Sequence, residues 1–140
     1  MPLPKNIISV VSPLIRTASL HLDDNMLTGT LVSELGLLVN LRKLLYCQQL
    51  LQADCSVILM RVQPLESLQF SENPSIFGTI PTELGNLESL RSFIAHFASL
   101  TGQIPDIFDS MTNLLQLQMP GNFFEGSMPT SIFSLSNLGK

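Results

Sequence analysis

The segment NPSIFGTIPTELGNLESL, residues 73–90, contains the pattern from which the architecture of the chain can be predicted. It sets Asn73, Gly78 and Pro81 among evenly spaced apolar residues, an order that neither a single helix nor a single strand requires. Closely related segments occur at three other places: GTLVSELGLLVNL (29–41, with Val where the others have Pro), GQIPDIFDSMTNL (102–114) and GSMPTSIFSLSNL (126–138). The chain is therefore built from an internal repeat, and the length of the repeat governs the rest of the interpretation.

A second motif precedes the asparagine and fixes the period. Leu65–Asn73 and Leu114–Asn122 both have the form L-x-x-L-x-apolar-x-x-N, and Thr17–Asn25 and Leu90–Ala98 are weaker copies. The start positions 17, 65, 90 and 114 are 48, 25 and 24 residues apart, so a further copy is expected at Leu41. The sequence thus predicts one domain over residues 1–140, with about five repeats beginning at 17, 41, 65, 90 and 114 and no complete cap at either end.

The alternation of apolar residues at Leu68/Phe70 and Leu117/Met119 is typical of a short strand with one buried face. Such strands are expected to stack in parallel, about 4.8 Å apart, because one strand cannot bury its apolar face alone. The asparagine that follows carries both a donor and an acceptor, so it can bond backbone groups of the neighbouring coil. Ala98 replaces this asparagine, and either a cost of about 1 kcal/mol or a bound water is expected there.

The glycines and prolines shape the rest of the coil. Gly29, Gly78, Gly102 and Gly126 are expected where coils approach closely or where φ is unusual. Pro81, Pro105 and Pro129 fix φ and remove an N–H group that irregular backbone could not pair. The segments that follow, such as TELGNL, are too short for a full α-helix, and a 3₁₀ turn is expected instead.

These motifs resemble the plant-type leucine-rich repeat family, whose consensus is L-x-x-L-x-L-x-x-N-x-L-x-G-x-I-P-x-x-L-G-x-L. FGTIPTELGNLESL is close to that consensus, and the resemblance extends from Ile7 to Leu138. It implies an α/β fold of a particular kind: a right-handed leucine-rich repeat solenoid with a parallel β-sheet on the concave face and short 3₁₀ turns and loops on the convex face.

Composition narrows the function. The net charge of −4 argues against a nucleic-acid partner, and no apolar stretch reaches the roughly 18 to 20 residues of a membrane span. The apolar run at Ile7–Val11 is short and no cleavage site follows, so no clear signal peptide is predicted. The family resemblance implies a cell-surface or extracellular location, which the sequence alone leaves open. Cys47 and Cys55 are too few for a disulfide framework.

The resemblance implies that partners bind the open face of the sheet. Phe97 and Ile94 are apolar residues expected to face water beside Arg91 and His96, which makes this group a candidate binding anchor. The candidate partner-binding residues are His21, Asp23, Arg42, Glu66, Gln69, Arg91, Ile94, His96, Phe97 and Gln118.

The expected function is non-catalytic binding of a protein, peptide or glycan as part of a receptor-like protein; the alternative is a stand-alone inhibitor of a secreted enzyme. Ser19, His21 and Asp23 have the residue types of a hydrolytic triad, but on one strand they fan outward without an oxyanion hole. No cofactor or metal is expected, because no nucleotide motif occurs and His21 and His96 lie three repeats apart. Residues 46–64 lose the Asn, Gly and Pro together, through either a degenerate repeat or a sequence error.

Overall fold

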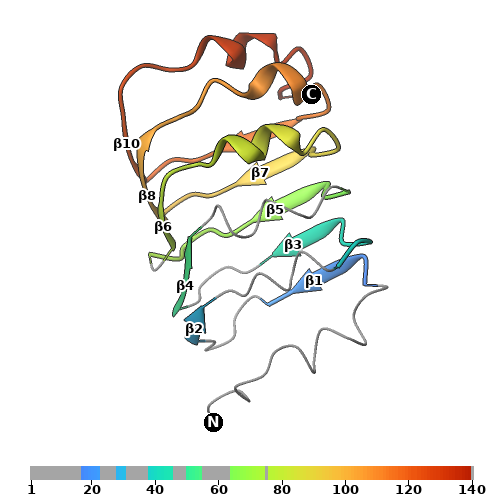
Figure 1. Ribbon diagram of the computed structural model, residues 1–140, viewed down its shortest axis with the longest axis vertical. Helices are drawn as coiled ribbons and strands as arrows, with labels where there is room; N and C mark the ends of the chain where they lie inside the picture. The colour runs from blue at the N-terminus through green and yellow to red at the C-terminus, as the bar shows by residue number, and fades with distance from the viewer. Residues whose placement is uncertain are drawn as a thin grey trace.

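The chain forms stacked coils, and each coil contributes one strand to each of two parallel sheets (Figure 1). The computed structural model describes residues 17–22, 28–30, 38–45, 50–54, 64–74 and 76–139, and at 28–30 and 50–54 the description is of the backbone. The first sheet contains, in spatial order, β1 (Ser19–His21), β3 (Lys43–Leu45), β5 (Ser67–Gln69), β7 (Ser92–Ile94) and β9 (Gln116–Gln118).

Neighbouring strands of the first sheet are one coil apart in the sequence. Leu20 pairs with Leu44, Leu44 with Leu68, Leu68 with Phe93, and Phe93 with Leu117, in each case in parallel. The central residue of each of the strands β3, β5 and β7 is buried, whereas the residues on either side of it are more accessible. The predicted solenoid with a parallel sheet is therefore confirmed, and its alternation of apolar residues is the buried face of that sheet.

A second parallel sheet is formed by the strands that follow the asparagine position of each coil, and this sheet was not predicted. It contains β2 (Thr28–Thr30), β4 (Leu50–Asp54), β6 (Ile76–Gly78), β8 (Ser99–Gln103) and β10 (Phe123–Glu125). The glycines in or after these strands have φ values of 99° at Gly78, 73° at Gly102 and 79° at Gly126. A Cβ atom on Gly102 would lie 2.9 Å from Cγ2 of Thr79. The predicted unusual φ at these three glycines is therefore confirmed, and close approach adds to it at Gly102.

A short 3₁₀ helix follows the proline in each of the last three coils, on the side opposite the first sheet (Figure 1). They are η3 (Thr82–Asn86), η4 (Phe108–Ser110) and η5 (Thr130–Ser134), which confirms the 3₁₀ turn predicted for TELGNL. The carbonyl of Pro81 accepts a bond from Leu84 N (3.1 Å) and begins the η3 turn. Within η3 a Cβ on Gly85 would lie 3.1 Å from Cβ of Ile107, so glycine allows the next coil to pack closely.

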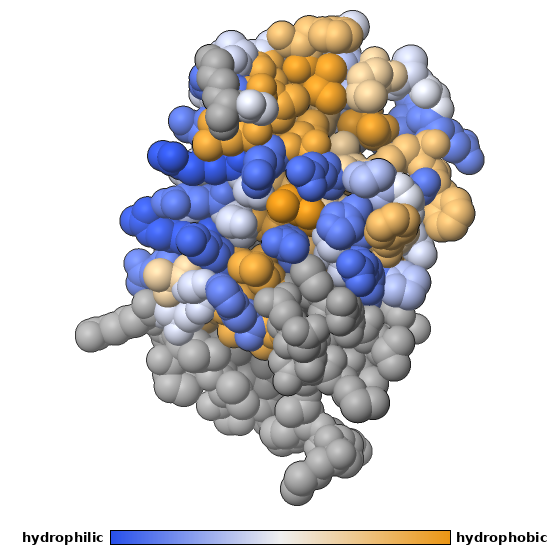
Figure 2. All heavy atoms as spheres, turned by 180° about the vertical axis from the view of Figure 1, so that it is seen from behind, coloured by the Kyte–Doolittle hydropathy of each residue, from blue (hydrophilic) through white to orange (hydrophobic). Residues whose placement is uncertain are grey.

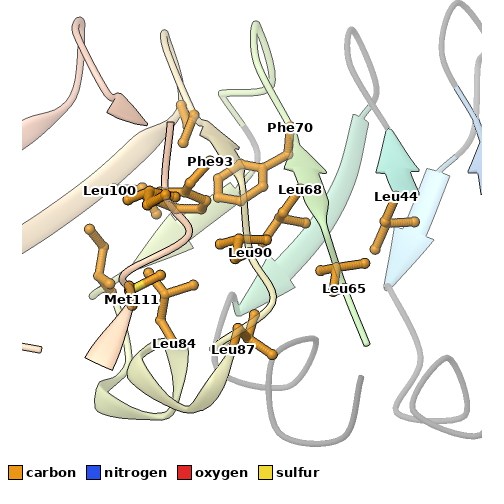
Figure 3. Close-up of a cluster of buried hydrophobic side chains, with 14 of the residues drawn as sticks. Leu44, Leu65, Leu68, Phe70, Leu84, Leu87, Leu90, Phe93, Leu100 and Met111 are labelled. Atoms are coloured by element: carbon orange, nitrogen blue, oxygen red, sulfur yellow. The ribbon is translucent and has the colours of Figure 1, made fainter. Parts of the chain in front are cut away.

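Leucine and phenylalanine side chains fill the space between the two sheets and the 3₁₀ helices (Figure 3). The rings of Phe70 and Phe93 meet edge to face, with centroids 5.6 Å apart and planes at 67°. Burying one such side chain stabilises the fold by about 1.5 to 3 kcal/mol. Since these two residues belong to successive coils, the core joins each coil to the next rather than closing within one coil.

The asparagine at the end of the strand bonds the preceding coil, as predicted. Asn122 Nδ2 donates to Ala95 O (2.7 Å) and to Met119 O (3.0 Å), and Asn122 Oδ1 accepts from Leu100 N (3.2 Å). The equivalent Asn73 is fully buried, and Asn25 lies outside the described residues. At Asn122 one side chain therefore satisfies backbone groups of two coils.

Ala98 occupies the asparagine position, yet the backbone amide that an asparagine there would bond, Ile76 N, still has a hydrogen-bond partner. Phe77 pairs with Ser99, which sets Ala98 beside Ile76 just as Asn122 is set beside Leu100. Ile76 N donates instead to Asn73 O of its own coil (3.0 Å). The 25-residue repeat has one extra residue in this turn, and the longer turn supplies the partner that an asparagine would otherwise supply.

Apolar side chains are also exposed near the C-terminal end of the solenoid. Figure 2 shows apolar residues gathered over the C-terminal coils, where Met128, Phe133 and Leu138 are exposed. Among the described residues, the structure has no helix with the length and apolar character of a membrane span.

The side opposite the first sheet carries a polar link between the last two coils. Asp106 Oδ1 accepts from Ser131 N (2.8 Å) and Oδ2 accepts from the hydroxyl of Thr130 (3.3 Å). Ser131 is buried, and its Oγ accepts from Phe108 N (3.0 Å). Hydrogen bonds from the Ser131 hydroxyl, and next from its backbone N–H, lower the pKa of Asp106; the Thr130 hydroxyl adds to this while burial opposes it.

The lowered pKa of Asp106 predicts that the fold loses stability in acid. Because the carboxyl is more acidic in the folded chain, its contribution is present above the ordinary aspartate pKa of about 3.9 and is lost as the pH falls below it. Urea unfolding at a series of pH values should therefore show the wild type exceeding Asp106→Asn in stability at neutral pH and converging on it in acid. A difference that is the same at every pH would contradict this account.

Candidate functional site

The open face of the first sheet is hollowed into a shallow groove of about 700 Å³. Three equivalent positions of each of the first four coils line it: the two residues before the central strand residue and the one after it. The lining residues are Ala18, Ser19, His21, Arg42, Lys43, Leu45, Glu66, Ser67, Gln69, Arg91, Ser92, Ile94 and Gln116. The repeat therefore builds the groove from corresponding positions, and only the side chains differ from coil to coil.

One row of the groove is charged. Arg42, Glu66 and Arg91 occupy the position that directly precedes β3, β5 and β7. Backbone bonds fix their spacing, because Glu66 N donates to Arg42 O (2.7 Å) and Arg91 N donates to Glu66 O (2.8 Å). The side chains of Arg42 and Glu66 form an ion pair. Both are partly accessible, so the pair contributes little stability and mainly sets the local charge pattern.

A second row holds neutral polar and apolar side chains. Leu45, Gln69 and Ile94 are aligned by the strand register, and each is partly buried. At one end of the groove Ser19 Oγ and His21 Nε2 are hydrogen-bonded (2.7 Å), and at the other Ser92 Oγ donates to Gln116 Oε1 (3.1 Å). The groove thus offers the apolar side chains of Leu45 and Ile94 on either side of Gln69, with hydrogen-bonding side chains at its two ends.

The structure brings six of the ten candidate residues together and separates the others. His21, Arg42, Glu66, Gln69, Arg91 and Ile94 line the groove. Gln118 lines a smaller depression with Leu115, Gln116, Leu117, Leu138 and Gly139. His96 and Phe97 follow the end of β7 and lie outside the groove lining, and Asp23 falls outside the described residues.

Phe97 is exposed but held in place. Its side chain is 60 % exposed, and its ring meets that of His96 edge to face at 5.7 Å. A Cβ atom on Gly121 of the next coil would lie 2.4 Å from Cδ1 of Phe97, so the ring lies over the bare backbone of that glycine. Phe97 itself has a φ of 53°, in the left-handed region that few non-glycine residues adopt.

Several groove residues are absent from the candidate list. Lys43, Leu45, Ser67, Ser92 and Gln116 all contribute to the lining. Their signal in the sequence is position alone: they precede or follow the central strand residue of their coil. Among the described residues, no group of three or more His, Cys, Asp or Glu side chains is arranged to hold a metal ion.

Comparison with curated proteins finds plant receptor-like proteins. The chain is 33 % identical over 125 residues to Receptor-like protein 41 of Arabidopsis thaliana, an alignment that covers 84 % of this chain and 14 % of the relative. No protein-family model matches the sequence. The chain thus spans about one seventh of the length of the curated relatives that it matches.

Two receptors are among the solved structures that resemble this chain in fold and sequence. A TDR receptor has a TM-score of 0.81 and 29 % identity, with 86 % of this chain and 21 % of that one covered. The Arabidopsis receptor kinase HAESA, solved with the peptide hormone IDA and the co-receptor SERK1, has a TM-score of 0.77 and 30 % identity, with 86 % and 20 % covered. Because its coils stack in parallel and its relatives are plant leucine-rich repeat proteins, the chain belongs to the plant-type leucine-rich repeat family.

Proposed function

We propose that this domain is a non-catalytic binding module of a receptor-like protein and that it holds an extended peptide in the groove of the first sheet. The observation that carries the proposal is the groove itself, which runs across successive strands. From β1 to β9 the groove crosses four strand spacings, about 19 Å, which matches about six extended residues. A ligand lying along this direction would contact every coil at equivalent positions.

The relatives support a peptide as the ligand. HAESA, which aligns with 86 % of this chain, was solved in complex with a peptide hormone. The groove offers the mixture that peptides require, with the apolar side chains of Leu45 and Ile94 beside the amide of Gln69.

The arrangement at Ser19 and His21 supports the non-catalytic part of the proposal. Their side chains are hydrogen-bonded, yet both residues are exposed on one short strand. The nearby amides of Arg42 and Lys43 both donate to Ala18 O (2.8 and 3.0 Å), so they are already used in the sheet. An acyl-transfer site requires amides that are free to stabilise an oxyanion.

A matched pair of variants tests the groove. Gln69→Trp places a bulky ring at the centre of the groove, whereas Gln103→Trp places the same ring on the exposed end of β8 in the second sheet. Peptides selected from a random displayed library against the wild-type chain should lose at least about tenfold in affinity for Gln69→Trp, about 1.4 kcal/mol, because the ring fills the space they occupy.

Those same peptides should bind Gln103→Trp as they bind the wild type. Selected peptides that bind Gln69→Trp unchanged would place the binding surface elsewhere and would refute the proposal.

A further inference from the structure

The described charges of the chain are segregated between the groove and the rest of the surface. All three Lys and Arg side chains that the structure describes, Arg42, Lys43 and Arg91, line the groove. Of the seven Asp and Glu side chains described with them, only Glu66 does so. The groove is therefore cationic, although the chain as a whole has a net charge of −4.

Two of the three cations are available to a ligand. Glu66 is paired with Arg42, and this is the one ion pair among the described side chains. Lys43 and Arg91 are exposed, and no described carboxylate lies within ion-pair distance of either. The groove therefore has an excess of two positive charges, while the acidic side chains elsewhere would repel an anionic ligand that approached another face.

We infer, on the basis of the proposed function, that the peptide held in this groove is acidic and places carboxylates on Lys43 and Arg91. A peptide is favoured over an acidic glycan because no Phe, Tyr or Trp ring, on which a sugar could stack, is among the described residues that line the groove. Leu45 in β3 and Ile94 in β7 instead provide apolar contacts for peptide side chains beside the two carboxylates.

The spacing of the two cations defines the spacing of the carboxylates. Lys43 lies in β3 and Arg91 directly precedes β7, with β5 between them, so their backbones are two strand spacings or about 10 Å apart. In a polyproline II segment, residues three apart lie on the same side and are separated by about 9.3 Å. An extended peptide with acidic residues at positions i and i+3 matches this distance.

Fluorescence polarisation with three labelled peptides, PEPPEP, PQPPQP and PKPPKP, tests the inference on the full chain at low ionic strength. PEPPEP should bind about tenfold more tightly than PQPPQP, and added salt should reduce the difference, because two accessible ion pairs contribute about this much. PKPPKP should bind most weakly.

The variants separate local charge from net charge. Lys43→Gln with Arg91→Gln should abolish the preference for PEPPEP over PQPPQP, and Lys43→Arg with Arg91→Lys should retain it. Gln103→Glu with Asn86→Asp changes the net charge by the same amount outside the groove and should leave the preference intact.

Several results would overturn the inference. Equal binding of PEPPEP and PQPPQP, with both blocked by Gln69→Trp, would refute the acidic ligand and leave the proposed peptide groove standing. Binding of oligogalacturonate in the groove in preference to PEPPEP would assign an acidic glycan instead. Binding of no peptide that Gln69→Trp can block would refute the inference and the proposed function together.

Discussion

Replacing Phe93 with alanine is expected to lower the free energy of unfolding by about 3 to 5 kcal/mol. The side chain is 2 % exposed, pairs in register with Leu68 and Leu117, and meets Phe70 edge to face. Its removal would leave a cavity between three successive coils, since the strands on either side are fixed by backbone bonds and cannot collapse into it. Urea unfolding followed by circular dichroism would measure the change.

Phe133→Ala provides the control for this variant. Phe133 is 83 % exposed, so its truncation is expected to change the free energy of unfolding by less than about 0.5 kcal/mol. Similar losses for the two phenylalanines would contradict the placement of the core between the two sheets.

The second large effect is expected from Asn122→Ala, at about 2 to 3 kcal/mol. This substitution removes two donated bonds, to Ala95 O and Met119 O, and one accepted bond, from Leu100 N. Alanine cannot replace them, so backbone groups in the partly buried turn lose their partners. The loss should appear as a lower urea midpoint with an unchanged dependence of the free energy on urea concentration.

Asn113→Ala separates this role from the general effect of losing an asparagine. Asn113 is exposed and donates one bond, to Glu88 O (2.9 Å), so a loss below about 1 kcal/mol is expected. Equal destabilisation by the two substitutions would show that the bridge at Asn122 has no special weight.

The first sheet and the role of Asn122 could be predicted from sequence because both depend on chemistry that one repeat displays by itself. Leu117 and Met119 alternate with polar residues, and only one face of a strand can be buried. Asparagine carries a donor and an acceptor on a short arm, which a buried backbone turn needs. The positive φ at Gly78, Gly102 and Gly126 was foreseen for a similar reason.

Other features depend on contacts between coils that no single repeat displays. The strands of the second sheet do not share one alternation of apolar and polar residues, and their pairing follows from the stacking set by the first sheet. The extra residue of the 25-residue repeat could be seen, but not that Ile76 N would bond Asn73 O. Phe97 and Gly121 are 24 positions apart, so the ring over the glycine appears only once the coils are stacked.

The sequence predicted which positions of each coil face the groove, but not which of their charged side chains pair with one another. The repeat phase identifies which residues of each coil face outward, and six of the candidates do line one groove. Which charges neutralise each other depends on the side chains of adjacent coils. The ion pair of Arg42 with Glu66, which leaves Lys43 and Arg91 as the available cations, could therefore be seen only with the strands in register.

The constant separation between paired residues has a consequence for how the chain folds. Each strand of the first sheet bonds a partner 24 or 25 residues away, so docking each new coil closes a loop of nearly the same length. The entropy lost in closing a loop depends on its length, and here that cost is almost equal for every coil. Growth from any nucleus can therefore advance in uniform increments, and no late step has to unite distant parts of the sequence.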